Sequence, residues 1–182
     1  MSQEIAPADL RAIAQMFRYP DAQTLSAPIP EEMGAEARAL LTKRRGIEPL
    51  GFESEYIRLF VNSLPELPCA PYGSVYLEGT VMGVSTVQVA KIYEKYGLQT
   101  DEMPDHIAVQ CQFLAWLREQ AEQSAEARED YAFLLDHLGR WLVPFLERVE
   151  QHDRLGWYRD CALWVSRVFV LQQAGKENGK KE

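Results

Sequence analysis

The side chains best suited to chemistry in this sequence are three histidines, each of which stands next to an aspartate. The pairs are Asp105-His106, Asp136-His137 and His152-Asp153. A histidine beside a carboxylate can act as a general acid or base when both side chains serve the same reacting atom. Neighbouring residues of a helix point about 100° apart, so adjacency in the sequence does not by itself make a catalytic dyad.

Motifs that would complete an active site are missing from the sequence. It contains no HExxH, GxSxG, Walker A or GxGxxG pattern. A hydrolase assembled from distant residues would also need a nucleophile and an oxyanion site, and the sequence points to neither. We therefore predict that the chain is not an enzyme and has no catalytic residue. A nucleotide-binding enzyme that uses His106 as a base is kept as an alternative.

The three cysteines, Cys69, Cys111 and Cys161, lie far apart in the sequence. Their number and spacing fit neither a disulfide framework nor a CxxC metal site. Two of them fall within apolar stripes, where a free cysteine behaves as a small buried hydrophobe. We predict no metal site and no cofactor. The first residues also lack the cationic and apolar regions of a secretory signal, so a reducing cytoplasm is the expected location.

Size and charge narrow the class of partner. The chain has 182 residues, 47% of them hydrophobic, and a formal net charge of −8. This length corresponds to one domain. An acidic protein without a concentrated basic face is not a general nucleic-acid binder, and its charge instead suits a basic partner. No apolar run approaches the ~20 residues that a membrane-spanning helix needs, so we expect no membrane insertion.

Apolar residues recur at helical spacing along nearly the whole chain, and no segment alternates long enough to predict a strand. We expect helices over 7–17, over 31–45, from near residue 52, from 85 to 96, from 104 to 121, over 126–150 and over 153–173. The stretch 126–150 is one helix or two, because Gly139 and Pro144 would kink or break it. The fold class is all-α, a single-domain bundle of six to eight helices over 1–173, followed by a polar, disordered tail over 174–182.

The helix expected from residue 85 has the strongest boundary signals. Ser85 and Gln88 match a capping box, in which the two side chains satisfy free backbone amides at the helix start. Val84 and Val89 are placed for a hydrophobic staple, and Gly97 suits the left-handed position that ends a helix.

The connection before this helix is unusually long. It spans the 24 residues 61–84, whereas helix connections in bundles usually have about 2–8 residues. Its aromatic and aliphatic residues are not typical of a disordered linker. We predict an ordered segment between the third and fourth helices, with a short helix over 73–77.

Three motifs in order resemble the TorD/DmsD family of redox-enzyme maturation chaperones, which is related to NarJ. They are Tyr56-Ile57-Arg58-Leu59-Phe60, Pro71-Tyr72-Gly73-Ser74-Val75-Tyr76-Leu77-Glu78-Gly79 and Met103-Pro104-Asp105-His106-Ile107. The resemblance extends from about Leu10 to Leu171. The sequence departs from the family pattern at Ala70, Gly73 and Gln110, where family members often carry proline, a larger polar residue and an acidic residue.

The resemblance implies an all-helical cytoplasmic chaperone, as a monomer or a dimer. Its implied partner is the apo catalytic subunit of a molybdopterin-dependent oxidoreductase, the twin-arginine signal peptide of that subunit, or both, and it would assist cofactor insertion and delay export. The implied peptide-binding residues are Tyr72, Ser74, Tyr76, Pro104, Asp105 and His106. The alternative from another class is a helical interaction module that acts on a mature enzyme domain and does not read a leader.

The residues themselves are compatible with peptide capture. A twin-arginine peptide has a basic end and an apolar stretch that suits a groove with aromatic anchors. Tyr72 and Tyr76, four residues apart, would share one aromatic face if the segment is helical. Asp105 offers a carboxylate that can accept two hydrogen bonds from an arginine.

Overall fold

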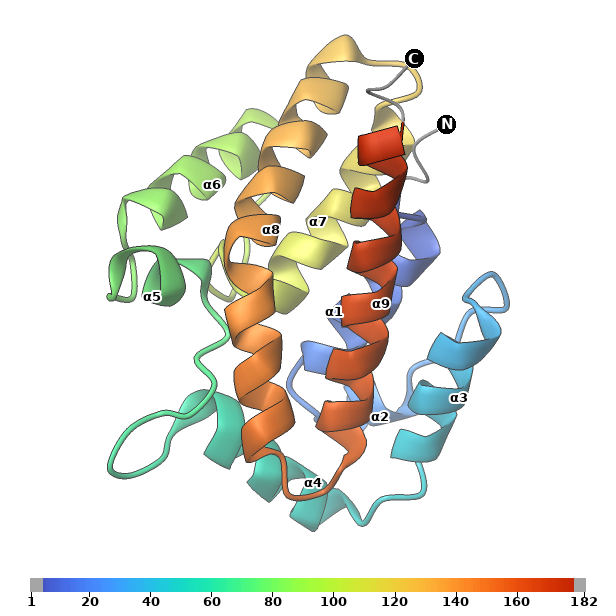
Figure 1. The fold of residues 1–182 in the computed structure, drawn as a ribbon, viewed down its shortest axis with the longest axis vertical. Helices are drawn as coiled ribbons and strands as arrows, with labels where there is room; N and C mark the ends of the chain where they lie inside the picture. Colours follow the sequence, from blue (N-terminus) through green and yellow to red (C-terminus); the bar gives the residue numbers. More distant parts are fainter. Residues whose placement is uncertain (1–4, 179–182) are drawn as a thin grey trace.

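The structure is a computed structural model that describes the backbone of residues 5–178 and the side chains of residues 5–169. These residues form an all-α bundle, as predicted (Figure 1). The elements are α1 (Pro7–Phe17), α2 (Ala22–Ser26), α3 (Ala35–Arg44), α4 (Pro49–Tyr56), a π-helical turn η1 (Ile57–Val61), α5 (Gly73–Glu78), α6 (Val84–Lys95), α7 (Ile107–Gln120), α8 (Ala125–His152) and α9 (Trp157–Asn178).

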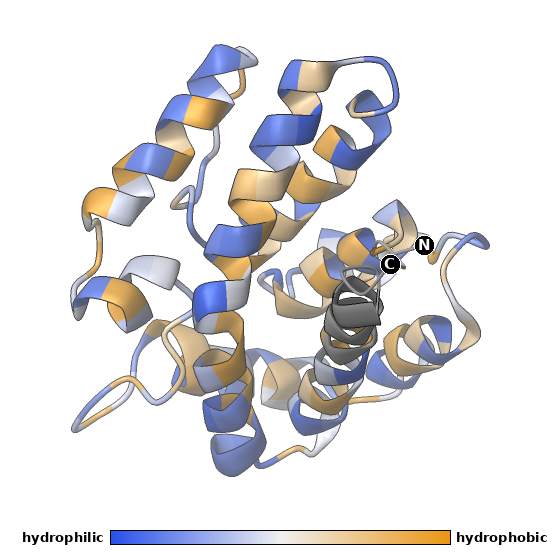
Figure 2. Ribbon diagram, turned by 45° about the horizontal axis from the view of Figure 1, so that its top comes forward, coloured by the Kyte–Doolittle hydropathy of each residue, from blue (hydrophilic) through white to orange (hydrophobic). Residues whose placement is uncertain are grey.

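The core lies where α1, α7, α8 and α9 pack together. Helix α1 packs most extensively on α7, α7 packs on α8, and α8 runs beside α9 (Figure 1). The predicted apolar stripes are buried: in α1 the stripe is Leu10, Ile13, Ala14 and Phe17, and in α7 it is Ile107, Cys111, Leu114, Leu117 and Ala121 just beyond its end. Along each helix in Figure 2, hydrophobic and hydrophilic residues alternate in short blocks, which is the pattern of helices with one buried face.

Of the two forms expected for the stretch 126–150, one helix or two, the structure has one: helix α8 continues for 28 residues through Gly139 and Pro144 without a break. Pro144 lies on the exposed face of the helix, between the buried Leu142 and Phe145. The carbonyl that proline leaves without an amide partner, that of Arg140, is on the same exposed side, where water can bind it. The buried stripe on both sides of the proline keeps the helix in one piece.

The start of α6 differs from the predicted capping box. The helix begins at Val84, and its free amides are satisfied by the carboxylate of Glu78 at the end of α5. The two oxygens of Glu78 accept from the Val84 and Ser85 amides at 2.6 and 2.8 Å. Val84 is 70% exposed, so the predicted staple with Val89 was also wrong. Gly97, with φ of 67°, follows the helix as predicted.

Other boundaries moved by a few residues. The predicted short helix in the connection 61–84 is present as α5, and the connection is ordered. The five-residue α2 was not predicted, and the helix expected over 31–45 is the shorter α3. Helix α9 extends to Asn178, beyond the predicted end at residue 173, and 179–182 lie outside the described residues. Among the described residues, none of the helices is both long and apolar enough to cross a bilayer.

Candidate functional site

Two of the sequence motifs, about 30 residues apart in the chain, meet in one joint. The segment around Tyr72 runs antiparallel to the segment around His106, and these two residues form an isolated β-bridge. The hydrogen bonds run from the Gly73 amide to the Asp105 carbonyl at 3.1 Å and from the Ile107 amide to the Pro71 carbonyl at 2.9 Å. We call the two segments 71–74 and 104–107 the motif joint. It fixes the start of α5 against the start of α7.

The carboxylate of Asp105 holds the motif joint together from the inside. One oxygen, Oδ2, accepts from the Ser74 amide at 2.8 Å and from the Thr86 hydroxyl at 3.0 Å. Asp105 and Ser74 are fully buried, and Thr86 is nearly so. A carboxylate at the first turn of α5 also interacts favourably with the free amides there. Thr86, which ties α6 to this carboxylate, was not recognised from the sequence.

His106 is the N-cap of α7, and the helix begins at Ile107 rather than at Pro104 as predicted. The Nδ1 atom of His106 accepts from the Ala108 amide at 3.1 Å. Burial lowers the pKa of His106 to about 4, so the ring is neutral at physiological pH, with its proton on Nε2. A ring whose Nδ1 is already engaged and whose pKa is so low is a poor general base, which disfavours the alternative of an enzyme built on His106.

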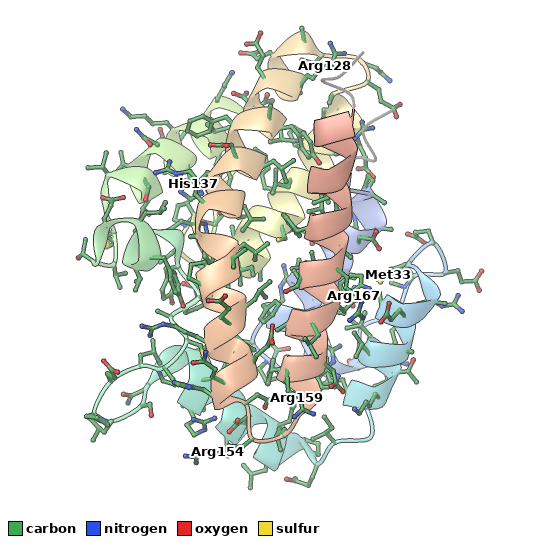
Figure 3. All side chains as sticks on the ribbon, viewed as in Figure 1. Met33, Arg128, His137, Arg154, Arg159 and Arg167 are labelled. Atoms are coloured by element: carbon green, nitrogen blue, oxygen red, sulfur yellow. The ribbon has the colours of Figure 1, made fainter. Side chains whose placement is uncertain are left out.

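Polar side chains from α7 and α8 lie next to the motif joint. Gln110 donates from Nε2 to the Leu134 carbonyl at 2.9 Å, and the same nitrogen lies 3.0 Å from Nδ1 of His137. Figure 3 shows His137 on the side of α8 toward α5 and α6. A Cβ atom on Gly73 would lie 2.7 Å from Nε1 of Trp141, so the close packing of α5 on α8 requires glycine there. Burial lowers the pKa of His137 as well.

Tyr72 and Pro104 are the members of the motif joint that reach the surface, and both are half-buried. The Tyr72 ring packs edge-on against His106, and its hydroxyl lies 3.5 Å from Glu102. Burial and this carboxylate raise the pKa of Tyr72 to about 12. Tyr76 instead stacks on Trp141, with ring centroids 5.8 Å apart. The single aromatic face expected for Tyr72 and Tyr76 is therefore not formed.

The match to known families includes the whole motif joint. Residues 26–147 match the family described as nitrate reductase delta subunit. The chain belongs to this family. It is 31% identical over 166 residues to the chaperone protein TorD of Vibrio cholerae, covering 84% of this chain and 72% of that protein. It is also 31% identical over 158 residues to the chlorate reductase assembly chaperone protein of Ideonella dechloratans, covering 76% and 74%.

The fold of this family member also agrees with a solved structure. A crystal structure from Archaeoglobus fulgidus, described as a candidate redox enzyme maturation protein, superposes with a TM-score of 0.65 at 26% identity and covers 94% of each chain. The resemblance to the TorD/DmsD group seen in the sequence is thus confirmed. The named relatives are chaperones and assembly proteins, which agrees with the expectation that this family member is not an enzyme.

The third motif of the family resemblance, residues 56–60, contributes side chains to the hydrophobic core. Tyr56, Leu59 and Phe60 at the end of α4 and in η1 are buried, and the Phe60 ring packs on Phe145 and Tyr158. This motif therefore stabilises the packing of the bundle and does not form a binding surface.

The cysteines offer no ligand or reactive group on the surface of this family member. Cys69, Cys111 and Cys161 are free and buried, and burial raises the pKa of Cys69 to about 12. Within residues that the structure describes, no group of three or more histidine, cysteine, aspartate or glutamate side chains is arranged to hold a metal ion.

Proposed function

We propose that this chain is a cytoplasmic chaperone for the catalytic subunit of a molybdopterin-dependent oxidoreductase and that it recognises the twin-arginine leader of that subunit before export. Family membership and relatives named as the chaperone protein TorD and as a chlorate reductase assembly chaperone support the chaperone role. The structural observation that carries the proposal is the motif joint, in which hydrogen bonds hold two family motifs together and Tyr72 and Pro104 reach the surface.

The six residues implied by the resemblance divide into two roles in this proposal. Tyr72 and Pro104 reach the surface and would contact the peptide, with Tyr76 as a half-buried neighbour. Ser74, Asp105 and His106 are buried and act as positioning residues, because they hold the backbone that carries the half-buried Tyr72 and Pro104. A rigid aromatic group needs little ordering on binding, which makes Tyr72 a suitable anchor.

Charge also supports a basic partner. The net charge of −8 raises the rate at which an arginine-rich peptide encounters the surface, although it does not set the identity of the peptide. Oxygen Oδ2 of Asp105 already accepts two internal hydrogen bonds, and Oδ1 is buried. A bidentate hydrogen bond between this carboxylate and an arginine of the leader would require the motif joint to open. The arginines therefore need another acceptor.

The test is a calorimetric titration with a synthetic twin-arginine leader of a molybdoenzyme subunit from the same genome. We expect micromolar or tighter binding that weakens with a twin-lysine peptide, because lysine lacks the planar fork of arginine. Tyr72→Ala and Pro104→Ala should each weaken binding about tenfold or more, whereas Pro30→Ala, a distant half-buried proline, should not.

A second titration, with the catalytic subunit itself, tests the alternative of a module that ignores leaders. Affinity that stays the same after the leader is removed, together with no binding of the isolated peptide, would support the module. Loss of affinity on leader removal would support the proposal.

A further inference from the structure

A cleft of about 570 Å³ opens beside the motif joint, between α7 and the segment that follows α6. Its floor is the outer face of α7, where Val109, Gln112, Phe113 and Trp116 stand at the helical spacing i, i+3, i+4 and i+7. Its wall is the segment 98–102. Tyr93 lines the cleft and donates its hydroxyl to the Pro104 carbonyl at 2.9 Å, so the cleft and the motif joint share a boundary.

The floor is a preformed aromatic surface. The rings of Phe113 and Trp116 are stacked, with centroids 5.7 Å apart and planes inclined by 12°. Tyr93 in α6 and Tyr96 just after it pack edge-on against these rings, with centroids 4.3 Å from Phe113 and 5.1 Å from Trp116. Phe113 is 6% exposed and Trp116 is half-buried, so Trp116 is the more accessible of the two rings at the cleft. Such a surface favours apolar side chains and the flat face of a guanidinium group.

Two adjacent carboxylates, Asp101 and Glu102, line the wall of the cleft, and both residues are exposed. The lining also includes one cation, Arg18, so its formal charge is negative by one. Oε1 of Glu102 accepts from the Met103 amide at 2.9 Å. Because both residues are exposed, an arginine can approach their carboxylates without opening the motif joint, unlike the interior carboxylate of Asp105. Acidic groups beside an aromatic floor suit a segment in which basic residues precede an apolar helical turn.

We infer that this cleft is the binding site of the leader peptide. An arginine of the leader would contact Asp101 and Glu102, and the apolar turn that follows it would pack on Phe113 and Trp116. The inference rests on the proposed function and adds to it the surface that selects the leader. It assigns Asp101, Glu102, Gln112 and Trp116 to leader recognition, none of which belongs to the motif joint. It also assigns Arg18 an opposing effect, since its charge repels a basic peptide.

Gln112 provides a direct test because it is exposed, lines the cleft and lies within α7. With the synthetic leader as the calorimetric probe, we expect Gln112→Arg to weaken binding about tenfold and Gln112→Glu to tighten it about threefold. The same two substitutions at Gln151, an exposed residue near the end of α8, are the matched control and should leave the affinity unchanged. Unchanged melting temperatures establish that all four variants are folded.

The wall is tested with a pair of double variants that alter the net charge equally. Asp101→Asn with Glu102→Gln should weaken leader binding about tenfold, whereas Glu31→Gln with Glu32→Gln, an exposed acidic pair before α3, should not. Arg18→Gln should change affinity in the opposite direction and tighten binding. A leader whose arginines are replaced by glutamines should bind the wild type and the Asp101/Glu102 variant equally, which shows that these carboxylates act on the arginines.

The outcomes separate this inference from the function on which it rests. A leader that binds the wild type but is insensitive to Gln112, Asp101/Glu102 and Arg18 substitutions overturns the cleft and leaves leader recognition standing. Equal losses in the Asp101/Glu102 and Glu31/Glu32 variants show a long-range charge effect and overturn the cleft too. A leader that does not bind the wild type at all overturns both.

Discussion

The carboxylate of Asp105 and the amide of Ser74 are joined by a 2.8 Å hydrogen bond inside the protein, and this contact connects the start of α7 to the start of α5. It turns two motifs that are separate in the sequence into one structural unit. The hydroxyl of Thr86 binds the same oxygen and adds α6 to that unit. A residue implied by the family resemblance to touch a peptide thus has a demonstrable structural role.

Replacement of this buried carboxylate should destabilise the protein. Asp105→Ala leaves the Ser74 amide and the Thr86 hydroxyl without partners, and we expect a loss of about 2–4 kcal/mol in the free energy of unfolding. Asp101→Ala, at an exposed aspartate four residues earlier, should change it by less than about 0.5 kcal/mol. Urea unfolding followed by circular dichroism measures both, and equal stabilities would contradict the role assigned to Asp105.

Two glycines, one packed against α8 and one within it, should respond in opposite directions to substitution by alanine. Gly73→Ala places a Cβ atom 2.7 Å from Nε1 of Trp141, so we expect a loss of about 1–3 kcal/mol. Gly139→Ala, in the exposed middle of α8 with no atom within 4 Å of the new Cβ, should stabilise by about 0.5–1 kcal/mol. Thermal melts of the two variants give the answer, and a stabilising Gly73→Ala would show that α5 is not fixed against Trp141.

Stability should fall in mild acid because of His106. Its pKa is about 4 in the folded protein and about 6.5 in the unfolded chain, so the unfolded state binds a proton first. The contribution of His106 is therefore constant above about pH 6.5, declines as the pH falls toward 4, and amounts to at most about 3 kcal/mol.

The variant His106→Asn isolates this contribution, because asparagine can cap α7 but does not titrate in this range. We expect the stability of the variant to depend less steeply on pH between 6.5 and 4 than that of the wild type. His137, whose pKa is also lowered by burial, remains in both proteins and accounts for part of the residual slope. Parallel curves for the two proteins would mean that His106 is not protected from protonation.

The thiols should be unreactive in the native state. Cys69, Cys111 and Cys161 are buried, and burial raises the pKa of each thiol. At pH 8, a thiol-specific alkylating reagent followed by mass spectrometry should find little modification in the native protein and rapid modification of all three cysteines in denaturant. Fast native labelling of Cys69 alone would reveal opening of the connection between η1 and α5.

Periodicity predicted the long helices because it records which face is buried. The stripes in α1 and α7 and the connection with its short helix followed from local patterns of apolar residues. Predictions from local sequence patterns were wrong where a residue outside the helix made the decisive contact. The amides at the start of α6 are capped by Glu78, which belongs to another helix, and no local pattern around Ser85 shows that. In α8, burial of Leu142 and Phe145 overcame the proline between them.

The candidate site, too, was predictable from the sequence only in part. The family motifs indicated which segments matter, but the sequence did not show that they pair with each other or that Asp105 points inward. The cleft depends on an aromatic pair at i and i+3 in α7, Phe113 and Trp116, which is visible in the sequence as a spacing. Its acidic wall could not be predicted, because only the structure shows that the segment after α6 lies beside that pair.

The packing of α1 on α7 has a consequence for synthesis of the protein. The apolar face of α1, with Leu10 and Phe17, finds its main partner only after Gln120 has been added, about 100 residues later. At a translation rate of about 5–20 residues per second, that face waits on the order of 5–20 seconds on the ribosome. For more than half of its elongation, the nascent chain of this protein therefore carries a hydrophobic helix without its main partner.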